Sequence, residues 1–391
     1  MNKTVPLMLA AVVLTATFVV LPAAEDNPAR PEPAKAQRCV NLVICLDTSG
    51  SMSGLIESAK QKLWAIVNEL ATARPRPKLR VGLYQYGNDG LDSGTGWVQR
   101  ICELTEDLDT VYGKLFALKT NGGTEYVARV VRSAARELDW DKDRGTLKMI
   151  FVAGNEAATQ DKEYKLKDIC KEAISKGIIV NSIFCGPTAE GRKTGWADVA
   201  AWTDGRYAAI DQDSGTVAIQ TPYDKKLTEL GEQLNKTYVA YGAKGQAGKA
   251  NQAAQDTNAA KLGAPAGAQR AAAKSTLLYN NASWDLVDAV KQNSVDMEKL
   301  KTDELPEGMR KMSREQRKAY LDKQYAERQR LQKEIQDLHA KRQEHVKKEM
   351  AKQGLSEAKA FDAVLRAAVR EQAAKKGFEF KGGEQAPPPS K

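Results

Sequence analysis

The sequence predicts an α/β fold with a doubly wound, mostly parallel six-stranded sheet, followed by a charged α-helical C-terminal region. One observation is the almost continuously apolar run at residues 40–46, which is typical of a central strand covered on both faces. Another is the alternation of short apolar runs with segments whose apolar residues recur at helical spacing. In such a sheet the ligand crevice lies beyond the carboxyl ends of the strands, so functional side chains are expected there.

Six short apolar runs in the first half of the chain predict the strands. They lie at residues 40–46, 79–86, 97–104, 147–153, 178–185 and 206–210. A polar, Gly-rich turn separates the second run from the third, which favours an antiparallel hairpin at one edge of the sheet. Helical spacing of apolar residues predicts helices at 55–70, 109–118, 127–138, 164–176 and 196–202, with a closing helix from residue 222.

The composition changes after residue 242. Residues 243–275 are rich in Ala, Gly, Gln and Lys and contain no aromatic residue, which predicts a flexible linker. Residues 276–380 are expected to form the charged helical region. A helix near residues 361–369 has a good apolar face and is expected to fold back on the long helix that precedes it.

The long helix at residues 313–350 carries only a thin apolar seam. In the heptad register set by its leucines and isoleucine, the seam also takes Arg328, Arg342 and His345, so a strong coiled coil is not expected. Residues 308–352 contain fourteen Lys and Arg against seven Asp and Glu, so most of the net charge of +9 lies here. Such a basic arm fits an anionic surface or polymer, or serves as a solvated face.

The N-terminal segment, residues 1–24, predicts export. A lysine precedes a long apolar run that ends in small residues, as in a secretory signal peptide, and the run is also long enough to remain as a membrane anchor. Residues 25–37 are Pro-rich and predict a linker, and residues 381–391 predict a disordered tail. We therefore expect a periplasmic, cell-envelope or secreted protein, with membrane association through the N-terminal segment as one outcome.

The chain has five cysteines, so at least one cannot pair within it. Cys45 lies in the first apolar run and is expected to act as a small core residue. Cys170 and Cys185 are candidates for a disulfide bond in an oxidising compartment. No C-x-x-C pattern occurs, which argues against zinc binding and thiol redox chemistry.

Three oxygen-bearing side chains follow the first strand at every second position. Asp47, Ser49 and Ser51 supply one carboxylate and two hydroxyls at a strand-to-helix turn. Mg²⁺ prefers such hard oxygen ligands and retains open positions for water or an incoming group. The structural alternative is a Ser/Gly-rich turn in which Asp47 only caps the helix.

The segment Asp47-Thr48-Ser49-Gly50-Ser51 resembles the metal-ion-dependent adhesion site of von Willebrand factor type A (VWA) domains, and the resemblance covers residues 38–242. It implies that Thr124, in an Asn-Gly-Gly-Thr loop, is a further ligand. The family usually places an aspartate after the fourth strand, where this chain has Gly154. Glu156, or the amide of Asn155, is expected to reach the ion instead. The resemblance implies Mg²⁺, or Mn²⁺ or Ca²⁺, as the cation.

These observations favour an exported bacterial VWA-domain protein that engages an acidic group of a protein partner, or an envelope polymer, through a divalent cation. The alternative is a metal-free structural envelope protein that binds through its basic helical arm. Enzymatic activity is not expected. The two histidines, His339 and His345, lie outside the α/β region, no phosphate-binding loop occurs, and a metal-assisted hydrolase would have only Glu156 as a base. Export argues against nucleic acid as the partner.

Overall fold

The computed structural model describes residues 38–210, 218–297, 299–353 and 361–380. The predicted signal segment, the linker at 25–37 and the tail at 381–391 lie outside the described residues. Within the described ranges, no helix combines the length and the apolar composition needed to cross a bilayer.

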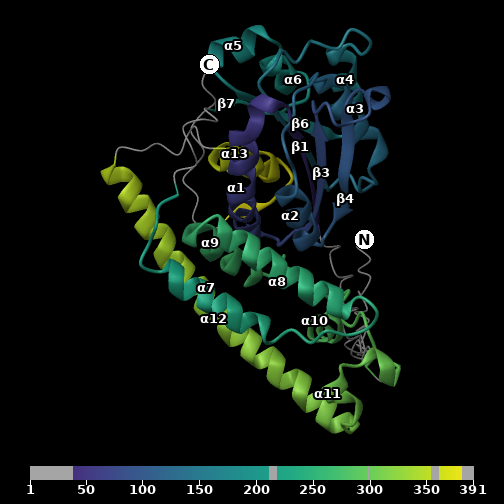
Figure 1. Ribbon diagram of the computed structural model, residues 1–391, viewed down its shortest axis with the longest axis vertical. Helices are drawn as coiled ribbons and strands as arrows, with labels where there is room; N and C mark the ends of the chain where they lie inside the picture. Colours follow the sequence, from purple (N-terminus) through teal and green to yellow (C-terminus); the bar gives the residue numbers. More distant parts are fainter. Residues whose placement is uncertain (1–37, 211–217, 298, 354–360, 381–391) are drawn as a thin grey trace, which may run out of the picture. The chain divides into compact units, whose positions relative to one another are not determined.

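A six-stranded sheet of order β4-β3-β1-β5-β6-β7 forms the centre of the α/β part (Figure 1). The strands are β1 (Cys39–Asp47), β3 (Lys78–Tyr86), β4 (Val98–Thr105), β5 (Leu147–Gly154), β6 (Ile178–Cys185) and β7 (Tyr207–Ile210). Only the β3–β4 pair is antiparallel, and the other pairs are parallel. The predicted fold class, including the edge hairpin, is therefore confirmed.

Helices cover both faces of the sheet, and alternate residues of β1 show which helices lie on which face. Leu42 and Ile44 belong to a core shared with α1 (Ser53–Ala71) and α2 (Leu108–Phe116). Val43 and Cys45 point the other way, into a core shared with α3 (Val127–Glu137), α4 (Leu166–Ser175) and α6 (Trp196–Ala201). A short helix, α5 (Thr188–Lys193), precedes α6. The apolar run of β1 is thus buried on both sides, as its composition predicts.

The prediction of a flexible linker at 243–275 is wrong, because this segment forms α8 (Gly245–Lys261) and α9 (Ala264–Lys274). Alanine has the highest helix propensity, and small residues let helices approach closely. A Cβ added at Gly231 on α7 (Asp224–Asn235) would lie 3.0 Å from the Cβ of Ala271 on α9. Charged side chains are also buried here: Arg270 is only 1% exposed and pairs with Asp109 of α2 at 2.7 Å.

The last helix, α13 (Phe361–Lys375), packs on α1 and β5 instead of folding back on the long helix (Figure 1). Leu365, Ala368 and Val369 are buried in the core that lies beneath α1 and α2. The chain then adds β8 (Glu379–Phe380), which pairs antiparallel with β2 (Ala73–Arg74). The C-terminal helix therefore completes one face of the sheet.

The long helix α12 (Arg314–Lys352) packs on α7, α9 and α10 (Leu286–Lys291). A short helix, α11 (Glu307–Arg310), precedes it. Its buried residues include Leu321, Leu331, Ile335 and the two arginines of the predicted seam, whereas His345 of that seam is only partly buried. Arg328 Nη1 lies 2.7 Å from Asp285 Oδ2, and Arg342 Nε lies 2.7 Å from Asp224 Oδ1. The two arginines of the seam can be buried because each forms an ion pair with a carboxylate, Asp285 or Asp224, outside α12.

All five cysteines lie within the described residues, and none of them forms a disulfide bond. The proposed bridge between Cys170 and Cys185 is therefore not present. Cys170 is fully buried beside the apolar residues of α3, α4 and β6, where it serves as a small core residue.

Candidate functional site

Asp47 is the last residue of β1 and is completely buried. Its Oδ1 accepts a hydrogen bond from the backbone N–H of Ser49 at 2.8 Å. Its Oδ2 is buried and has no hydrogen-bond partner among the described residues. Buried carboxylate oxygens normally have partners, so an atom left in this state marks a place where a ligand fits.

The two serine hydroxyls lie together beside Asp47. Ser49 Oγ and Ser51 Oγ are 3.3 Å apart, and Asn155 Nδ2 donates to Ser51 Oγ at 3.0 Å. The other amide atom of this side chain, Asn155 Oδ1, is buried without a partner among the residues described. The structure therefore brings Asp47, Ser49 and Ser51 together and adds the Asn155 amide from the end of β5.

The loop that carries Thr124 lies against the turn after β1. Asn121 N–H donates to the Thr48 carbonyl at 3.0 Å, and a Cβ added at Gly50 would lie 3.5 Å from Gly122 N. A Cβ added at Gly123 would lie 2.1 Å from the Gly87 carbonyl oxygen, so this position requires glycine. Thr124 itself is partly buried, and its hydroxyl forms no hydrogen bond with any described residue.

Glu156 lies at the edge of this group and is exposed. Its backbone is held in place, because Trp196 Nε1 donates to the Glu156 carbonyl at 2.7 Å. Its charge nevertheless acts on the site, since it raises the pKa values of Asp47 and Glu125. The structure thus places Glu156 within electrostatic range of Asp47, with its side chain facing solvent.

The sequence interpretation missed Glu125, which is 8% exposed beside Asp47. A Cβ added at Gly87 would lie 2.6 Å from Glu125 Cγ and 2.9 Å from Asp47 Oδ1, so the two acidic side chains flank one glycine. The available signal was its position, directly after Thr124 and two residues before α3 begins.

Gly154 stands where the resemblance places an aspartate, and the structure shows why a side chain does not fit there. An added Cβ would lie 2.5 Å from Tyr86 Oη and 3.0 Å from Asp47 Oδ2. Tyr86 is fully buried, and its hydroxyl donates to the Ala153 carbonyl at 3.0 Å. The phenol of Tyr86 therefore fills the space beside Asp47, and β5 approaches it only with glycine at this position.

Residues 42–155 match the family model of the von Willebrand factor type A domain. The chain contains a VWA domain. The match spans β1 to β5 and includes Asp47, Ser49, Ser51 and Thr124. No curated protein matches the chain.

Several solved structures resemble the described fold. One is the VWA domain of SpRpn10, at 16% identity and a TM-score of 0.35, with 44% of this chain and 88% of that chain covered. Another is mussel byssus proximal thread matrix protein 1 with a zinc-occupied MIDAS motif, at 11% identity and a TM-score of 0.36, covering 45% and 43%. The pilus adhesin SpaC from Lactobacillus rhamnosus GG has 16% identity and a TM-score of 0.36, covering 46% and 29%. At these values, what those proteins bind does not transfer to this chain.

Three acidic side chains, Asp47, Glu125 and Glu156, lie at or near this site, and two of them are buried. The pKa of Asp47 is raised to about 7, mainly by burial and also by the charges of Glu125 and Glu156, while hydrogen bonds from Ser49 oppose the rise. Burial also raises the pKa of Glu125, where hydrogen bonding from Ser49 opposes it and the charge of Glu156 adds to it. The charges of Glu125 and Glu156 thus create a negative potential at Asp47 that favours a cation.

The residues at this turn fit a hard divalent cation. Among the described residues, no three His, Cys, Asp or Glu side chains form a metal-binding group. The turn instead combines the Asp47 carboxylate with the hydroxyls of Ser49 and Ser51 and the Asn155 amide oxygen. Two of its oxygens, Asp47 Oδ2 and Asn155 Oδ1, are buried without partners. All these donors are oxygens, which suits Mg²⁺, Mn²⁺ or Ca²⁺.

Proposed function

We propose that this protein is an exported VWA-domain binding protein that engages an acidic group of a protein partner through a divalent cation. Asp47, Ser49, Ser51 and Thr124 hold the cation, and Glu156 contributes from the edge of the site. The observation that carries the proposal is Asp47 Oδ2, a buried carboxylate oxygen without a partner among the described residues, beside two serine hydroxyls 3.3 Å apart.

The charge of this donor set supports binding of an acidic partner. Asp47 is the only carboxylate among Asp47, Ser49, Ser51 and Thr124, so these four ligands leave one positive charge on a divalent ion, which the nearby charges of Glu125 and Glu156 reduce. When bound, the cation supplies a positively charged coordination position for a carboxylate of the partner. The Asn155 amide keeps Ser51 oriented, since its Nδ2 donates to Ser51 Oγ.

Calorimetric titration of the full chain with Mg²⁺ and Mn²⁺ tests the cation. Wild type is expected to bind and to melt at higher temperature, because a ligand at 100 times its Kd stabilises the folded state by about 2.7 kcal/mol. Asp47→Asn is expected to lose both effects, whereas Asp168→Asn, an exposed carboxylate on α4, should keep them. Binding that is unchanged in Asp47→Asn would remove the cation from this turn.

The partner is tested by affinity capture from a cell-envelope extract with and without EDTA. A protein that is retained by wild type, released by EDTA and absent with Asp47→Asn is the expected result. Retention that ignores EDTA would point away from the cation. Localisation is tested separately, by fractionating cells that express the full chain and by sequencing the N-terminus of the recovered protein.

A second candidate is a metal-free envelope protein that binds an anionic polymer through α12. It is favoured by one observation: Arg328 and Arg342 turn inward, while Lys318, Lys323 and Lys333 are exposed. Deleting residues 276–391 is not a clean test, because α13 belongs to the core of the sheet. Changing the three exposed lysines to Glu is cleaner, since loss of envelope association with retained Mg²⁺ binding would favour this candidate.

A further inference from the structure

A cavity with a volume of about 780 Å³ lies at the other end of the sheet from Asp47. Arg80, one of its lining residues, pairs with Asn41 near the start of β1, whereas Asp47 ends that strand. The remaining wall comes from the end of β4, the start of α2, the first turns of α8 and the loop at 280–284. Its volume lies in the range of small-molecule sites.

The α8 wall of this cavity is built at helical spacing. Lys244, Ala247, Gly248 and Asn251 line it and fall on one face of the helix. Gly248 is needed there, because an added Cβ would lie 2.3 Å from the Trp284 ring. Trp284 is only 5% exposed and stacks on Tyr238 with a centroid distance of 5.6 Å. The wall behind the cavity is therefore firmly packed.

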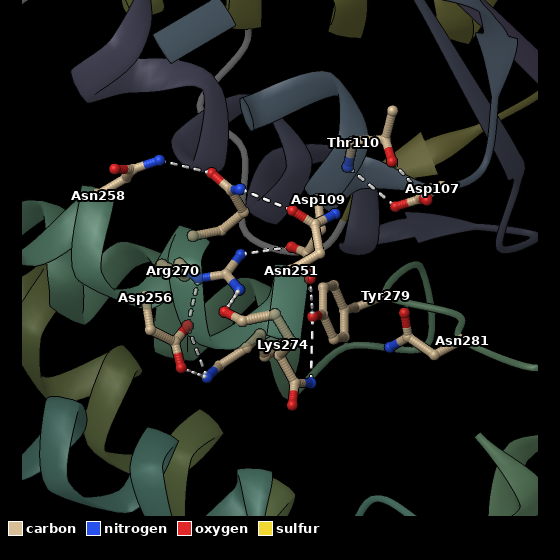
Figure 2. Close-up of polar contacts among 12 residues, drawn as sticks. Asp107, Asp109, Thr110, Asn251, Asp256, Asn258, Arg270, Lys274, Tyr279 and Asn281 are labelled. Atoms are coloured by element: carbon tan, nitrogen blue, oxygen red, sulfur yellow. Dashed lines mark hydrogen bonds and ion pairs between the residues drawn. The ribbon is translucent and has the colours of Figure 1, made fainter. Parts of the chain in front are cut away.

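The acidic residues of the cavity are already engaged within the protein. Glu106 pairs with Lys78 at 2.7 Å. Asp107 caps α2 by accepting from Thr110 N–H at 2.9 Å and from Thr110 Oγ1 at 2.7 Å (Figure 2). Lys78 offsets the charge of Glu106, whereas the hydrogen bonds to Asp107 come from neutral donors and use only its acceptor capacity.

The groups that remain available are donors. In the part of the chain that the structure describes, Lys244 has no ion-pair partner, and Arg80 approaches a carboxylate only at 3.9 Å, that of Asp139. No side chain caps the N-terminus of the 17-residue helix α8, whose first N–H groups and dipole favour negative charge.

Asn281 provides an independent observation at the same cavity. It is 5% exposed, and its Oδ1 accepts from Trp284 Nε1 at 3.1 Å. Its Nδ2 is buried and has no partner among the residues described. Two further amides line the cavity with it, those of Asn251 and Asn280, and Figure 2 shows Asn251 and Asn281 in the same region as Asp107 and Thr110. Amides offer both donors and acceptors, which matches hydroxyl groups.

We propose that this cavity binds a small polyhydroxylated anion, a sugar that carries a phosphate or a carboxylate. The anionic group binds at Lys244 and the N-terminus of α8, where the uncompensated positive charge lies. The hydroxyl groups bind along the amides of Asn251 and Asn281, since the Asn280 amide already exchanges hydrogen bonds with Gln292. The site is separate from the cation turn at Asp47, because the two lie at opposite ends of β1.

The test is calorimetric titration of the full chain with glucose 6-phosphate, glucuronate, glucose and inorganic phosphate. At least one of the two anionic sugars should bind, and both glucose and phosphate should bind at least tenfold more weakly. The better of the two sugars identifies the anionic group. Failure of both to bind, or equal binding of glucose or phosphate, overturns the proposal.

Matched variants place the ligand in the cavity. Lys244 is exposed, so Lys244→Glu should fold normally and weaken binding of the better sugar at least tenfold. Lys249 is also exposed and lies on α8, but it does not line the cavity, so Lys249→Glu should leave binding within twofold. Asp47→Asn should also leave it unchanged, which separates this result from the cation site. Equal loss in both lysine variants overturns the proposal.

Discussion

At the scale of single residues, the contact between Tyr86 and Gly154 decides which atoms can lie beside Asp47. The Tyr86 hydroxyl is bonded to the Ala153 carbonyl and occupies the position that a side chain at residue 154 would need. The proposed cation site therefore has candidate donors in the first turn, in the Thr124 loop and at Asn155, one residue beyond the end of β5.

Gly154→Ala is expected to destabilise the protein by about 1–3 kcal/mol, because the added Cβ overlaps Tyr86 Oη and forces a shift in a packed core. Tyr86→Phe removes that oxygen, so the same glycine substitution should cost less in the Tyr86→Phe background. Urea unfolding of the two single variants and the double variant measures the coupling. Additive free energies would show that the two residues do not compete for space.

Asp256 of α8 forms ion pairs with two buried basic side chains of α9, Arg270 and Lys274. It accepts from Arg270 Nε and lies 2.7 Å from Lys274 Nζ (Figure 2). Arg270 and Lys274 are 1% and 2% exposed. Burial raises the pKa of Asp256, but the charges of Lys274 and Arg270 outweigh it and lower the pKa from 3.8 to about 2. Below the usual pKa of a carboxyl group, the unfolded chain takes up the proton first.

Stability from this residue is therefore expected to be complete above about pH 4 and to be lost as the pH falls towards 2, by about 2 kcal/mol in total. Asp256→Asn should be strongly destabilised at pH 6, because it leaves two buried cations short of a partner. The difference from wild type in urea unfolding should shrink between pH 6 and pH 3. A difference that stays constant would contradict the lowered pKa.

At the scale of elements, α13 is the helix whose position matters most to the VWA domain. It packs on α1 and β5, and Asn181 of β6 exchanges hydrogen bonds with Gln372 at 3.1 and 2.6 Å. Arg38, just before β1, donates to the carbonyls of Lys376 and Gly377 at 2.7 and 2.9 Å. A segment more than 300 residues beyond the first strand thus closes the sheet's face.

Leu365→Ala is expected to cost about 2–5 kcal/mol, since Leu365 is fully buried and its truncation leaves a cavity under α1. Lys375→Ala on the same helix is the control, because Lys375 is exposed and its ion pair with Glu371 is long, at 3.4 Å. Guanidinium unfolding monitored by tryptophan fluorescence measures both. Equal stability of the two variants would mean that α13 does not support the sheet.

How well the sequence predicts an element depends on whether the contacts that stabilise it are local or distant in the sequence. The strands and helices of the VWA domain carry their own apolar periodicity, so they were predicted close to their observed bounds. The helices α8 and α9 were not, because their Ala-rich composition lacks a hydrophobic stripe and their burial depends on Arg270 meeting Asp109, 161 positions earlier. Asp47, Ser49 and Ser51 were expected from a local motif, and Thr124 only from the resemblance to VWA domains. Glu125 and Tyr86 needed the fold to show that they lie beside it.

At the scale of the whole molecule, the VWA domain and the helices that follow it share their buried interior. The helices α8 and α9 pack on α2 and α1, respectively, and α7 packs on α9. Arg270 pairs with Asp109 of the VWA domain and also stacks over Trp64 of α1 at 4.8 Å. Ala259 and Ala273 of α8 and α9 belong to the same core cluster as β1. The hydrophobic core is therefore shared by residues on both sides of position 242.

Thermal unfolding of the described fold is therefore expected to be one cooperative transition, in which the VWA domain and helices α7 to α12 melt together. In scanning calorimetry, the calorimetric enthalpy should equal the van't Hoff enthalpy. Arg270→Ala breaks the buried pair with Asp109 and should lower that single transition by the equivalent of about 3–5 kcal/mol. An independent helical region joined by a flexible linker would instead melt in a transition of its own. In that case Arg270→Ala would leave the melting of the sheet, followed by near-UV circular dichroism, unchanged.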